Sequence, residues 1–209
     1  MRILIVDDHP LVRRGMISLM RDHFKEAEFG EAESSREGFA AVMNGSWDLV
    51  IVDVSMPGRS GLDLIKDIRL VKPHLALMVV SAQSERDYAI RALKLGAAGY
   101  VSKQSAPDVL VAAVRRVLSG GRYVSPAVAE LLASSLAEGD AEGSHETLSN
   151  RELQVLKLIA SGKSLKEIGV ELDLSEKTVA TYRARISEKM CLPTNVDLTR
   201  YAMRHGLVD

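Results

Sequence analysis

The stretch Ile3-Leu4-Ile5-Val6-Asp7-Asp8 decides the fold of the first half of the chain. Four consecutive large apolar residues predict a short strand, and because the run is continuous, the strand is expected to be buried on both faces. Strands of this kind belong to parallel sheets that helices cover on both sides. The two aspartates directly after the run place acidic groups at the carboxyl end of the strand.

The same arrangement recurs along residues 1–122, where short apolar runs alternate with amphipathic stretches of helical period. This order predicts an α/β domain with a five-stranded parallel sheet of the flavodoxin-like, doubly wound type. Strands are predicted at 3–6, 27–32, 49–52, 75–80 and 99–101, and helices at 11–22, 35–44, 61–70, 85–95 and 107–118.

A change of composition follows Gly121. A linker is therefore predicted at 123–146, and residues 122–132 are compatible with a short helix. From Ala133 to Glu146 the chain is rich in Ser, Ala, Gly and Glu and holds one large apolar residue, Leu136, so this part is expected to be flexible.

The last part, residues 147–209, has only helical patterns and predicts a small all-α domain. Ser149 and Ser164 each begin an S-x-x-E capping box, which marks a helix start. Helices at 165–172 and 176–190 separated by a short turn form a helix-turn-helix pattern. A further helix is predicted at 196–205.

The cysteine count, the length of the apolar runs and the net charge limit the class of protein. The single cysteine, Cys191, excludes an intramolecular disulfide and a cysteine-based zinc cluster, and it is interpreted as a packing residue in a reducing compartment. No apolar run approaches the roughly 20 residues that span a bilayer, and no secretory leader precedes the first strand. These features predict a cytoplasmic protein without a membrane partner. A net charge of -1 leaves nucleic-acid binding open, since a local basic stripe can bind phosphates.

Polar side chains follow the ends of the predicted strands: Asp7 and Asp8 after the first, Asp53 after the third, Ser81 after the fourth and Lys103 after the fifth. In a doubly wound sheet these positions meet at one edge. Three carboxylates repel one another and favour a bound cation, and their oxygen ligands suit Mg2+. A lysine and a hydroxyl can then bind a phosphate group. Each residue alone is equally well explained as a cap or a solvated side chain, but the five together predict a phosphate site.

These segments resemble the receiver domains of response regulators. The similar segments are Ile3 to Pro10, Asp53 to Gly58 and Gly99 to Lys103, and the resemblance covers about residues 1–120. It implies that a sensor histidine kinase phosphorylates Asp53.

The resemblance also implies roles for the neighbouring residues. Mg2+ is expected on Asp8, Asp53 and the carbonyl of Ser55, with Asp7 acting mainly through water. Ser81 and Tyr100 are expected to form a switch pair, in which the hydroxyl moves to the phosphoryl group and the ring turns inward. His9 is interpreted as a loop or helix-start residue, the alternative being a metal ligand.

An enzyme is the alternative for this domain, because aspartate-based phosphatases also combine a carboxylate nucleophile with Mg2+. Those enzymes place a second Asp two residues after the nucleophile, where this chain has Ser55. The domain is therefore not expected to be an enzyme, apart from Mg2+-dependent self-phosphorylation and slow self-dephosphorylation of Asp53.

The helix predicted at 176–190 combines basic residues with an apolar stripe of Val179, Ile186 and Met190, as a recognition helix in the DNA major groove requires. Residues 147–209 resemble the LuxR/NarL type of helix-turn-helix, and with the receiver they indicate the NarL/FixJ group. Contacts to double-stranded DNA are expected from one set of residues: Lys177, Thr178, Thr181, Tyr182, Arg183, Arg185 and Lys189.

The recognition helix departs from the family pattern at Ala180 and Tyr182, where relatives usually carry Lys and His. The loss of a long donor puts base readout at Ala180 in doubt, although alanine can contact a thymine methyl group. An alternative function is therefore kept: a protein-binding regulator whose helix-turn-helix contacts a partner protein.

The linker indicates how phosphorylation is expected to act. A flexible tether transmits proximity better than a rigid movement, so phosphorylation is expected to promote a homodimer that binds two DNA half-sites. The resemblance implies a dimer contact on the terminal helix.

Overall fold

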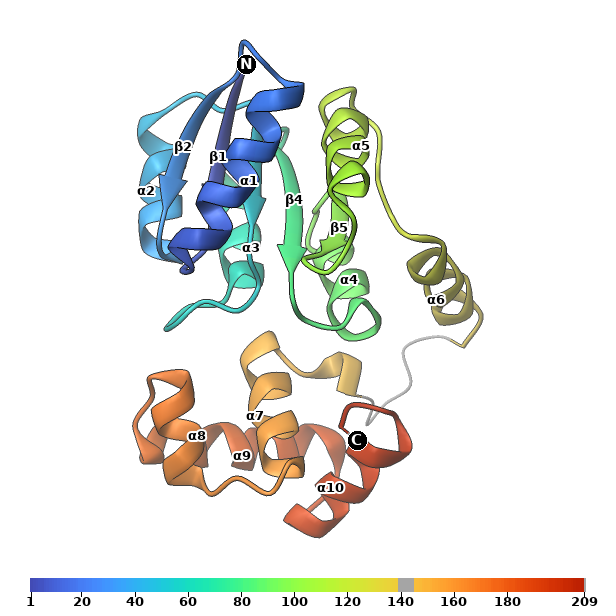
Figure 1. Cartoon of the computed structure of the whole chain (residues 1–209). Coiled ribbons are helices and arrows are strands. Elements are labelled where there is room, and N and C mark those ends of the chain that lie inside the picture. Colours follow the sequence, from blue (N-terminus) through green and yellow to red (C-terminus); the bar gives the residue numbers. More distant parts are fainter. Residues whose placement is uncertain (139–144, 209) are drawn as a thin grey trace. The chain divides into compact units, whose positions relative to one another are not determined.

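The computed structural model of the chain describes residues 1–138 and 145–208. The chain divides into two compact units, Met1–Ala133 and Ser134–Asp209, and each is described by itself (Figure 1).

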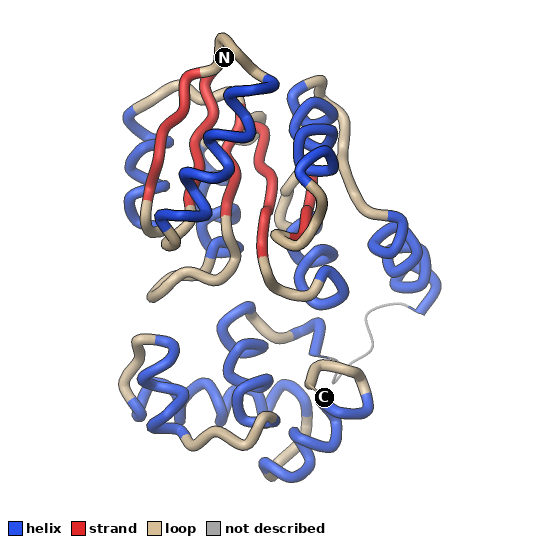
Figure 2. Tube along the Cα trace, viewed as in Figure 1, coloured by secondary structure: helices blue, strands red, loops and turns tan. Residues whose placement is uncertain are grey.

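The first unit contains a five-stranded sheet in which every strand runs parallel to its neighbours (Figure 2). The order is β2-β1-β3-β4-β5, so the connections change direction beside β1. Ligands of such sheets bind outside the carboxyl ends of the strands at this change of direction. The predicted fold class is confirmed. The strands are β1 (Arg2–Val6), β2 (Glu28–Ala32), β3 (Leu49–Val52), β4 (Ala76–Ser81) and β5 (Gly99–Ser102).

Five helices cover the two faces of this sheet (Figure 1). They are α1 (Pro10–His23), α2 (Ser35–Asn44), α3 (Gly61–Val71), α4 (Glu85–Lys94) and α5 (Pro107–Leu118). Helices α1 and α5 pack together on one face, and α3 packs between α2 and α4 on the other. Residues 3–6 and 49–52 are buried throughout, as the continuous apolar runs predict. Each fully buried Leu, Ile or Val contributes roughly 1.5–3 kcal/mol to folding.

The prediction that residues 133–138 lack a fixed structure is wrong. Helix α6 (Pro126–Glu138) continues through this part of the predicted linker. Its sequence is dominated by Ala, Leu and Glu, which favour helix, and Val128 is fully buried. The low density of apolar residues therefore did not prevent helix formation. Residues 139–144 of the predicted linker lie outside the described residues, and η1 (His145–Thr147) follows them.

The start of the predicted linker belongs to the first unit. The backbone N–H of Tyr123 donates to the carbonyl of Ala98, and the carbonyl of Tyr123 accepts from Tyr100, so this segment pairs with the edge of the sheet at β5. The hydroxyl of Ser125 donates to a carboxylate oxygen of Glu85, 2.5 Å away at the start of α4. The first unit thus extends beyond residue 122.

The second unit contains α7 (Asn150–Ala160), α8 (Leu165–Leu172), α9 (Glu176–Met190) and α10 (Asn195–Arg204). The predicted capping boxes at Ser149 and Ser164 are both present, since each serine accepts from the third helical residue and a glutamate returns the contact. The turn between α8 and α9 requires Gly169, because a Cβ there would lie 2.7 Å from the carbonyl oxygen of Leu174. Asp173 closes the turn with a φ of 53°.

In the part of the chain that the structure describes, no helix has the length and apolar character needed to cross a membrane.

Candidate functional site

The acidic residues predicted to meet at the sheet edge do so. Asp7 and Asp8 follow β1, and Asp53 follows β3, where its backbone N–H donates to the carbonyl of Val6 at 2.8 Å. One potential ligand atom from each of Asp7, Asp8, His9 and Asp53 lies within 4.8 Å of the others. The side chains of Asp7 and Asp53 are almost fully buried, with 0% and 2% exposed. A group of three carboxylates, two of them buried, needs positive charge close by.

Lys103 supplies one positive charge. Its Nζ lies 2.7 Å from Oδ2 of Asp7 and 2.8 Å from Oδ2 of Asp53. Burial alone lowers the pKa of Lys103, but its hydrogen bonds to Asp53 and Asp7 outweigh burial, and the net shift is upward. Lys103 therefore stays charged at neutral pH and neutralises one of the three carboxylates.

The second carboxylate oxygen of Asp53, Oδ1, is left without a hydrogen-bond partner among the described residues, although it is buried. Leaving a buried carboxylate oxygen unpaired is costly unless a ligand satisfies it. The oxygen atoms of Asp8 and Asp53 form the kind of donor set that hard divalent cations prefer. The residues present therefore fit Mg2+, with one Asp53 oxygen available for chemistry.

The loop after Asp53 is shaped by a close approach of helix α3. A Cβ on Gly61 would lie 1.8 Å from the carbonyl oxygen of Asp53, so only glycine fits there. Ser55 lies in this loop, and its hydroxyl accepts a hydrogen bond from Nε2 of Gln83 at 2.7 Å.

The residues of the predicted switch pair are both fully buried at the same sheet edge. Ser81 ends β4, and its Oγ accepts from the backbone N–H of Gln83 at 3.3 Å. The Tyr100 hydroxyl donates to the carbonyl of Gln83 at 2.9 Å, and burial raises the pKa of Tyr100. The tyrosine ring is thus already turned inward and neutral. Gln83, which sequence reasoning did not single out, contacts Ser55, Ser81 and Tyr100.

His9 directly precedes α1, and its side chain makes no capping hydrogen bond to the helix. Its Nδ1 also lies 3.0 Å from Oδ1 of Asp8 and 3.3 Å from Oδ1 of Asp7, while the side chain is 63% exposed. The ring therefore borders the acidic group from the solvent side.

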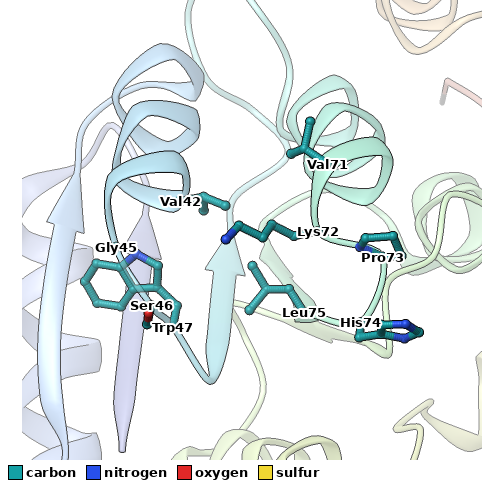
Figure 3. Close-up of a pocket in the computed structure, with 9 residues that line it drawn as sticks. All are labelled: Val42, Gly45, Ser46, Trp47, Val71, Lys72, Pro73, His74 and Leu75. Carbon is teal, nitrogen blue, oxygen red and sulfur yellow. The ribbon is translucent and has the colours of Figure 1, made fainter.

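A separate hollow of about 420 Å3 lies at the amino-terminal ends of β3 and β4, away from the acidic residues (Figure 3). Trp47, Lys72 and His74 belong to its lining, which contains no carboxylate. The Nε1 of Trp47 donates to the carbonyl of Ala41 at 2.9 Å. Among the described residues, the group of carboxylates that could hold a metal lies at the carboxyl ends of the strands, and this hollow contains none of its members.

In the second unit, α9 has the two faces that the sequence predicts. Val179, Ile186 and Met190 are buried, which confirms the apolar stripe. Lys177, Thr181 and Arg185 are exposed at helical spacing and form one outer face.

The other predicted DNA contacts are half-buried or have partners within the unit. Tyr182 is half-buried, and the Thr178 hydroxyl lies 2.7 Å from that of Ser175. The guanidinium of Arg183 donates to the Asn195 side chain and to the carbonyl of Pro193, both at 3.0 Å. Nζ of Lys189 lies 2.6 Å from Oε2 of Glu152 on α7. Of the predicted basic contacts, Lys177 and Arg185 are thus the most available to an outside partner.

The ion pair between Glu152 and Lys189 makes stability depend on pH. Burial alone raises the pKa of Glu152, but hydrogen bonds from Lys189 and from Ser149 outweigh burial, and the pKa lies below its ordinary value. The stabilisation is therefore complete above the unfolded-state pKa of about 4.3 and is lost as the pH falls through the lower folded-state pKa. We predict that Glu152→Gln lowers the free energy of unfolding at neutral pH, and that this difference shrinks below about pH 4.

Urea unfolding of the full chain, followed by circular dichroism at several pH values, measures this difference. Glu171→Gln is the matched control, since Glu171 is a partly exposed glutamate of the same unit that pairs with Lys163. A Glu152→Gln difference that stays constant between about pH 7 and pH 3 would contradict the assignment of the low pKa to Glu152.

Comparison with known proteins agrees with this geometry. Residues 3–115 match the response regulator receiver domain, and residues 146–202 match the luxR family of bacterial regulatory proteins. The chain is 36% identical over 208 residues to the response regulator GacA of Pseudomonas protegens, with 100% of this chain and 98% of GacA covered. It is also 36% identical over 206 residues to the response regulator UvrY of Escherichia coli, with 98% and 94% covered.

Solved structures give the same result. The response regulator RcsB of Salmonella typhimurium aligns with a TM-score of 0.61 and 28% identity, covering 97% of this chain and 99% of that chain. A structure of RcsB in complex with DNA aligns with a TM-score of 0.59 and 28% identity, covering 97% and 98%.

Proposed function

The chain belongs to the two-component response regulators that join a receiver domain to a LuxR-type helix-turn-helix, and on this premise we propose that phosphorylation of Asp53 controls its binding to DNA. The observation that carries the proposal is the buried, unpartnered Oδ1 of Asp53, beside the charged Lys103 at the edge of the receiver sheet. The chain is a DNA-binding response regulator, and its relatives are regulators and not enzymes.

The proposed phosphorylation uses residues already described. One carboxylate oxygen of Asp53 attacks the phosphorus of a phosphohistidine on a sensor histidine kinase, so that an O–P bond forms while the N–P bond to histidine breaks. Lys103 and the Ser81 hydroxyl then bind phosphoryl oxygens. Asp8, Asp53 and the Ser55 carbonyl would hold Mg2+, with Asp7 acting through water. Bound there, the ion neutralises negative charge on the transferred group.

Turnover by the receiver is expected to be limited to its own aspartyl phosphate. Ser55, two residues after Asp53, is not acidic and cannot act as a general acid. Small phosphoryl donors are expected to phosphorylate Asp53 directly, followed by slow self-dephosphorylation. In the switch, the Ser81 hydroxyl turns to the phosphoryl group, which favours the inward Tyr100 held by the carbonyl of Gln83.

For DNA, α9 is proposed as the helix that enters the major groove. Lys177 and Arg185 on its outer face contact phosphates first, and Thr181 lies between them near the bases. Thr178, Tyr182, Arg183 and Lys189 remain proposed contacts, although Lys189 has to share its charge with Glu152. Because phosphate contacts release counterions, affinity for mixed genomic DNA should fall steeply with salt. Weak salt dependence would favour a protein partner in place of DNA, an alternative that the relatives do not favour.

Phosphorylation is proposed to promote a homodimer. Two RcsB dimers bound to two parallel DNAs are a solved structure similar to this chain, with a TM-score of 0.61 and 28% identity. The phosphoacceptor domain is proposed at 1–122, with the segment after it packed against β5, and the DNA-binding domain at 147–209. A regulator of bacterial DNA acts in the cytoplasm, which is also the compartment that suits the free thiol of Cys191.

We predict that Ala180→Lys changes DNA preference without unfolding the protein. Ala180 is half-buried and helical, on the same side of α9 as the exposed Lys177 and Ala184, and lysine is a good helix former. A new base contact by lysine can change discrimination by about 1–3 kcal/mol. Selection from random DNA compares the motifs of wild type and variant. An unchanged motif and affinity would show that position 180 does not face the bases.

A further inference from the structure

Arg13 is a buried cation beside the acidic residues of the receiver, and the proposed phosphorylation chemistry does not use it. It lies on the first turn of α1, and its side chain is 5% exposed. Nη1 donates to the backbone carbonyl of Asp7 at 2.6 Å. Nε lies 3.1 Å from Oε2 of Glu31, and Nη2 lies 2.8 Å from Oε1 of Glu33. The guanidinium thus ties the turn between β1 and α1 to the residues at the end of β2.

The contact with the Asp7 carbonyl completes the immobilisation of that residue. The Asp7 backbone N–H donates to the carbonyl of Ala32 at 3.1 Å. Its Oδ1 accepts from the backbone N–H of His9 at 2.8 Å, and its Oδ2 pairs with Lys103. With Arg13 on the carbonyl, the backbone N–H, the carbonyl and Oδ1 of Asp7 are all hydrogen-bonded, and Oδ2 is held by the ion pair with Lys103.

Fixing this carbonyl also fixes Asp8. The peptide unit is planar, so the orientation of the Asp7 carbonyl determines where the nitrogen and Cα of Asp8 lie. The Asp8 carboxylate belongs to the group that can hold a metal, and it leaves the chain from that Cα. Mg2+ demands near-ideal octahedral geometry and tolerates little displacement of a ligand.

We propose that Arg13 is a positioning residue for the metal site: through the Asp7 carbonyl it holds the Asp7-Asp8 peptide in the orientation that the metal requires. This inference rests on the proposed function, since it concerns the same site. Arg13 is not one of the residues proposed to bind the metal or the phosphoryl group, and it acts through the backbone of Asp7.

Replacement of Arg13 is expected to change the affinity for the metal in opposite directions, depending on whether Arg13 acts through its charge or by positioning Asp8. If Arg13 acted only as a nearby positive charge, Arg13→Met would strengthen cation binding, because it removes repulsion from the metal. Glu33→Gln would weaken binding for the same reason. If Arg13 positions Asp8, Arg13→Met weakens binding even though the site becomes more negative, and Glu33→Gln leaves binding close to that of wild type.

The test measures metal binding to the unphosphorylated full-length protein. Free Mn2+ is followed by electron paramagnetic resonance, and Mg2+ is measured by its competition with Mn2+. Replacement of an outer partner of a metal ligand typically costs 10–100-fold in affinity, so Arg13→Met is expected to weaken Mg2+ binding by roughly this factor. Glu33→Gln is expected to change it by less than about threefold.

A double variant distinguishes a loss of positioning from a change in net charge and from a loss of folding. Arg13→Met/Glu33→Gln conserves the net charge and does not leave Glu33 without its partner. It is expected to melt within a few degrees of wild type by circular dichroism and to lose the same affinity as Arg13→Met. Metal binding by the double variant at the level of wild type overturns the inference, as does tighter binding by Arg13→Met.

The proposed function and the positioning role of Arg13 can be disproved separately. If wild type neither binds Mn2+ nor accepts a phosphoryl group from acetyl phosphate, the proposed function is wrong. If wild type does both and the Arg13 variants bind metal equally well, only the positioning role of Arg13 is wrong.

Discussion

Asp53→Asn is expected to abolish phosphorylation by acetyl phosphate and Mg2+ completely, whereas wild type gains one phosphoryl group. Asp53 directly follows the central strand β3, pairs with Lys103 through Oδ2, and keeps its buried Oδ1 without a hydrogen-bond partner among the described residues. Asparagine has nearly the same shape but is a far weaker nucleophile than a carboxylate. Intact-protein mass spectrometry after incubation with the donor measures the result.

The fold of this variant should persist, because it removes one of three mutually repelling carboxylates. Asp22→Asn, at an exposed aspartate of α1, serves as the control and should be labelled like wild type. Equal labelling of Asp53→Asn and wild type would remove Asp53 as the phosphoacceptor.

Phosphorylation is expected to raise affinity for paired DNA half-sites by about 10²–10⁴, and to leave affinity for a single half-site nearly unchanged. Two receivers that pair bring two helix-turn-helix units together, so the second unit binds at a high effective concentration. No new base contact is required. Half-sites roughly 34 Å apart, one helical turn, would suit two such recognition helices. Binding of phosphorylated and unphosphorylated protein to both DNAs at fixed salt measures the gain.

Release of a masked recognition helix is the competing explanation. It requires that the fragment 147–209 bind a single half-site much more tightly than the unphosphorylated full-length chain. The dimer explanation expects similar affinities for these two proteins. A large advantage of the fragment on one half-site would therefore overturn the dimer explanation.

The fold of the receiver was predictable because its strands are short, continuous apolar runs. The first strand is predicted at 3–6 and observed at Arg2–Val6. Because ligands bind outside the carboxyl ends of the strands in such sheets, the sequence also predicts that Asp53 and Lys103 lie together. Both inferences depend on patterns that a sequence shows directly.

The contacts that sequence reasoning missed are made by long polar side chains between distant segments. Arg13 reaches Glu31 in β2 and Glu33 just after it, and the Gln83 amide, after β4, reaches Ser55 in the loop after β3. The helical repeat predicts the face of the helix on which a residue lies, but it does not predict which distant residue a long side chain contacts. Lys189 shows the same limit. It was expected on the DNA face as a basic residue of the recognition helix, yet it pairs with Glu152 on α7.

The wrong prediction for the second half of α6 has a different cause. The stretch around Ala133 has few large apolar residues, so its composition resembles that of a linker. Alanine and leucine still favour helix locally, and the buried Val128 fixes the first turn. The prediction considered only how little apolar surface the segment can bury, and it left out the helix propensity of its residues.

The central claim is that phosphorylation of Asp53 controls DNA binding, and the affinity of the full-length protein for DNA tests it most directly. A fragment with paired half-sites, obtained by selection from random DNA, is titrated with protein before and after treatment with acetyl phosphate and Mg2+. Wild type is expected to bind more tightly after treatment, and Asp53→Asn is expected to bind with the same affinity before and after. An equal gain in Asp53→Asn, or no gain in wild type whose phosphorylation is confirmed by mass, would contradict the claim.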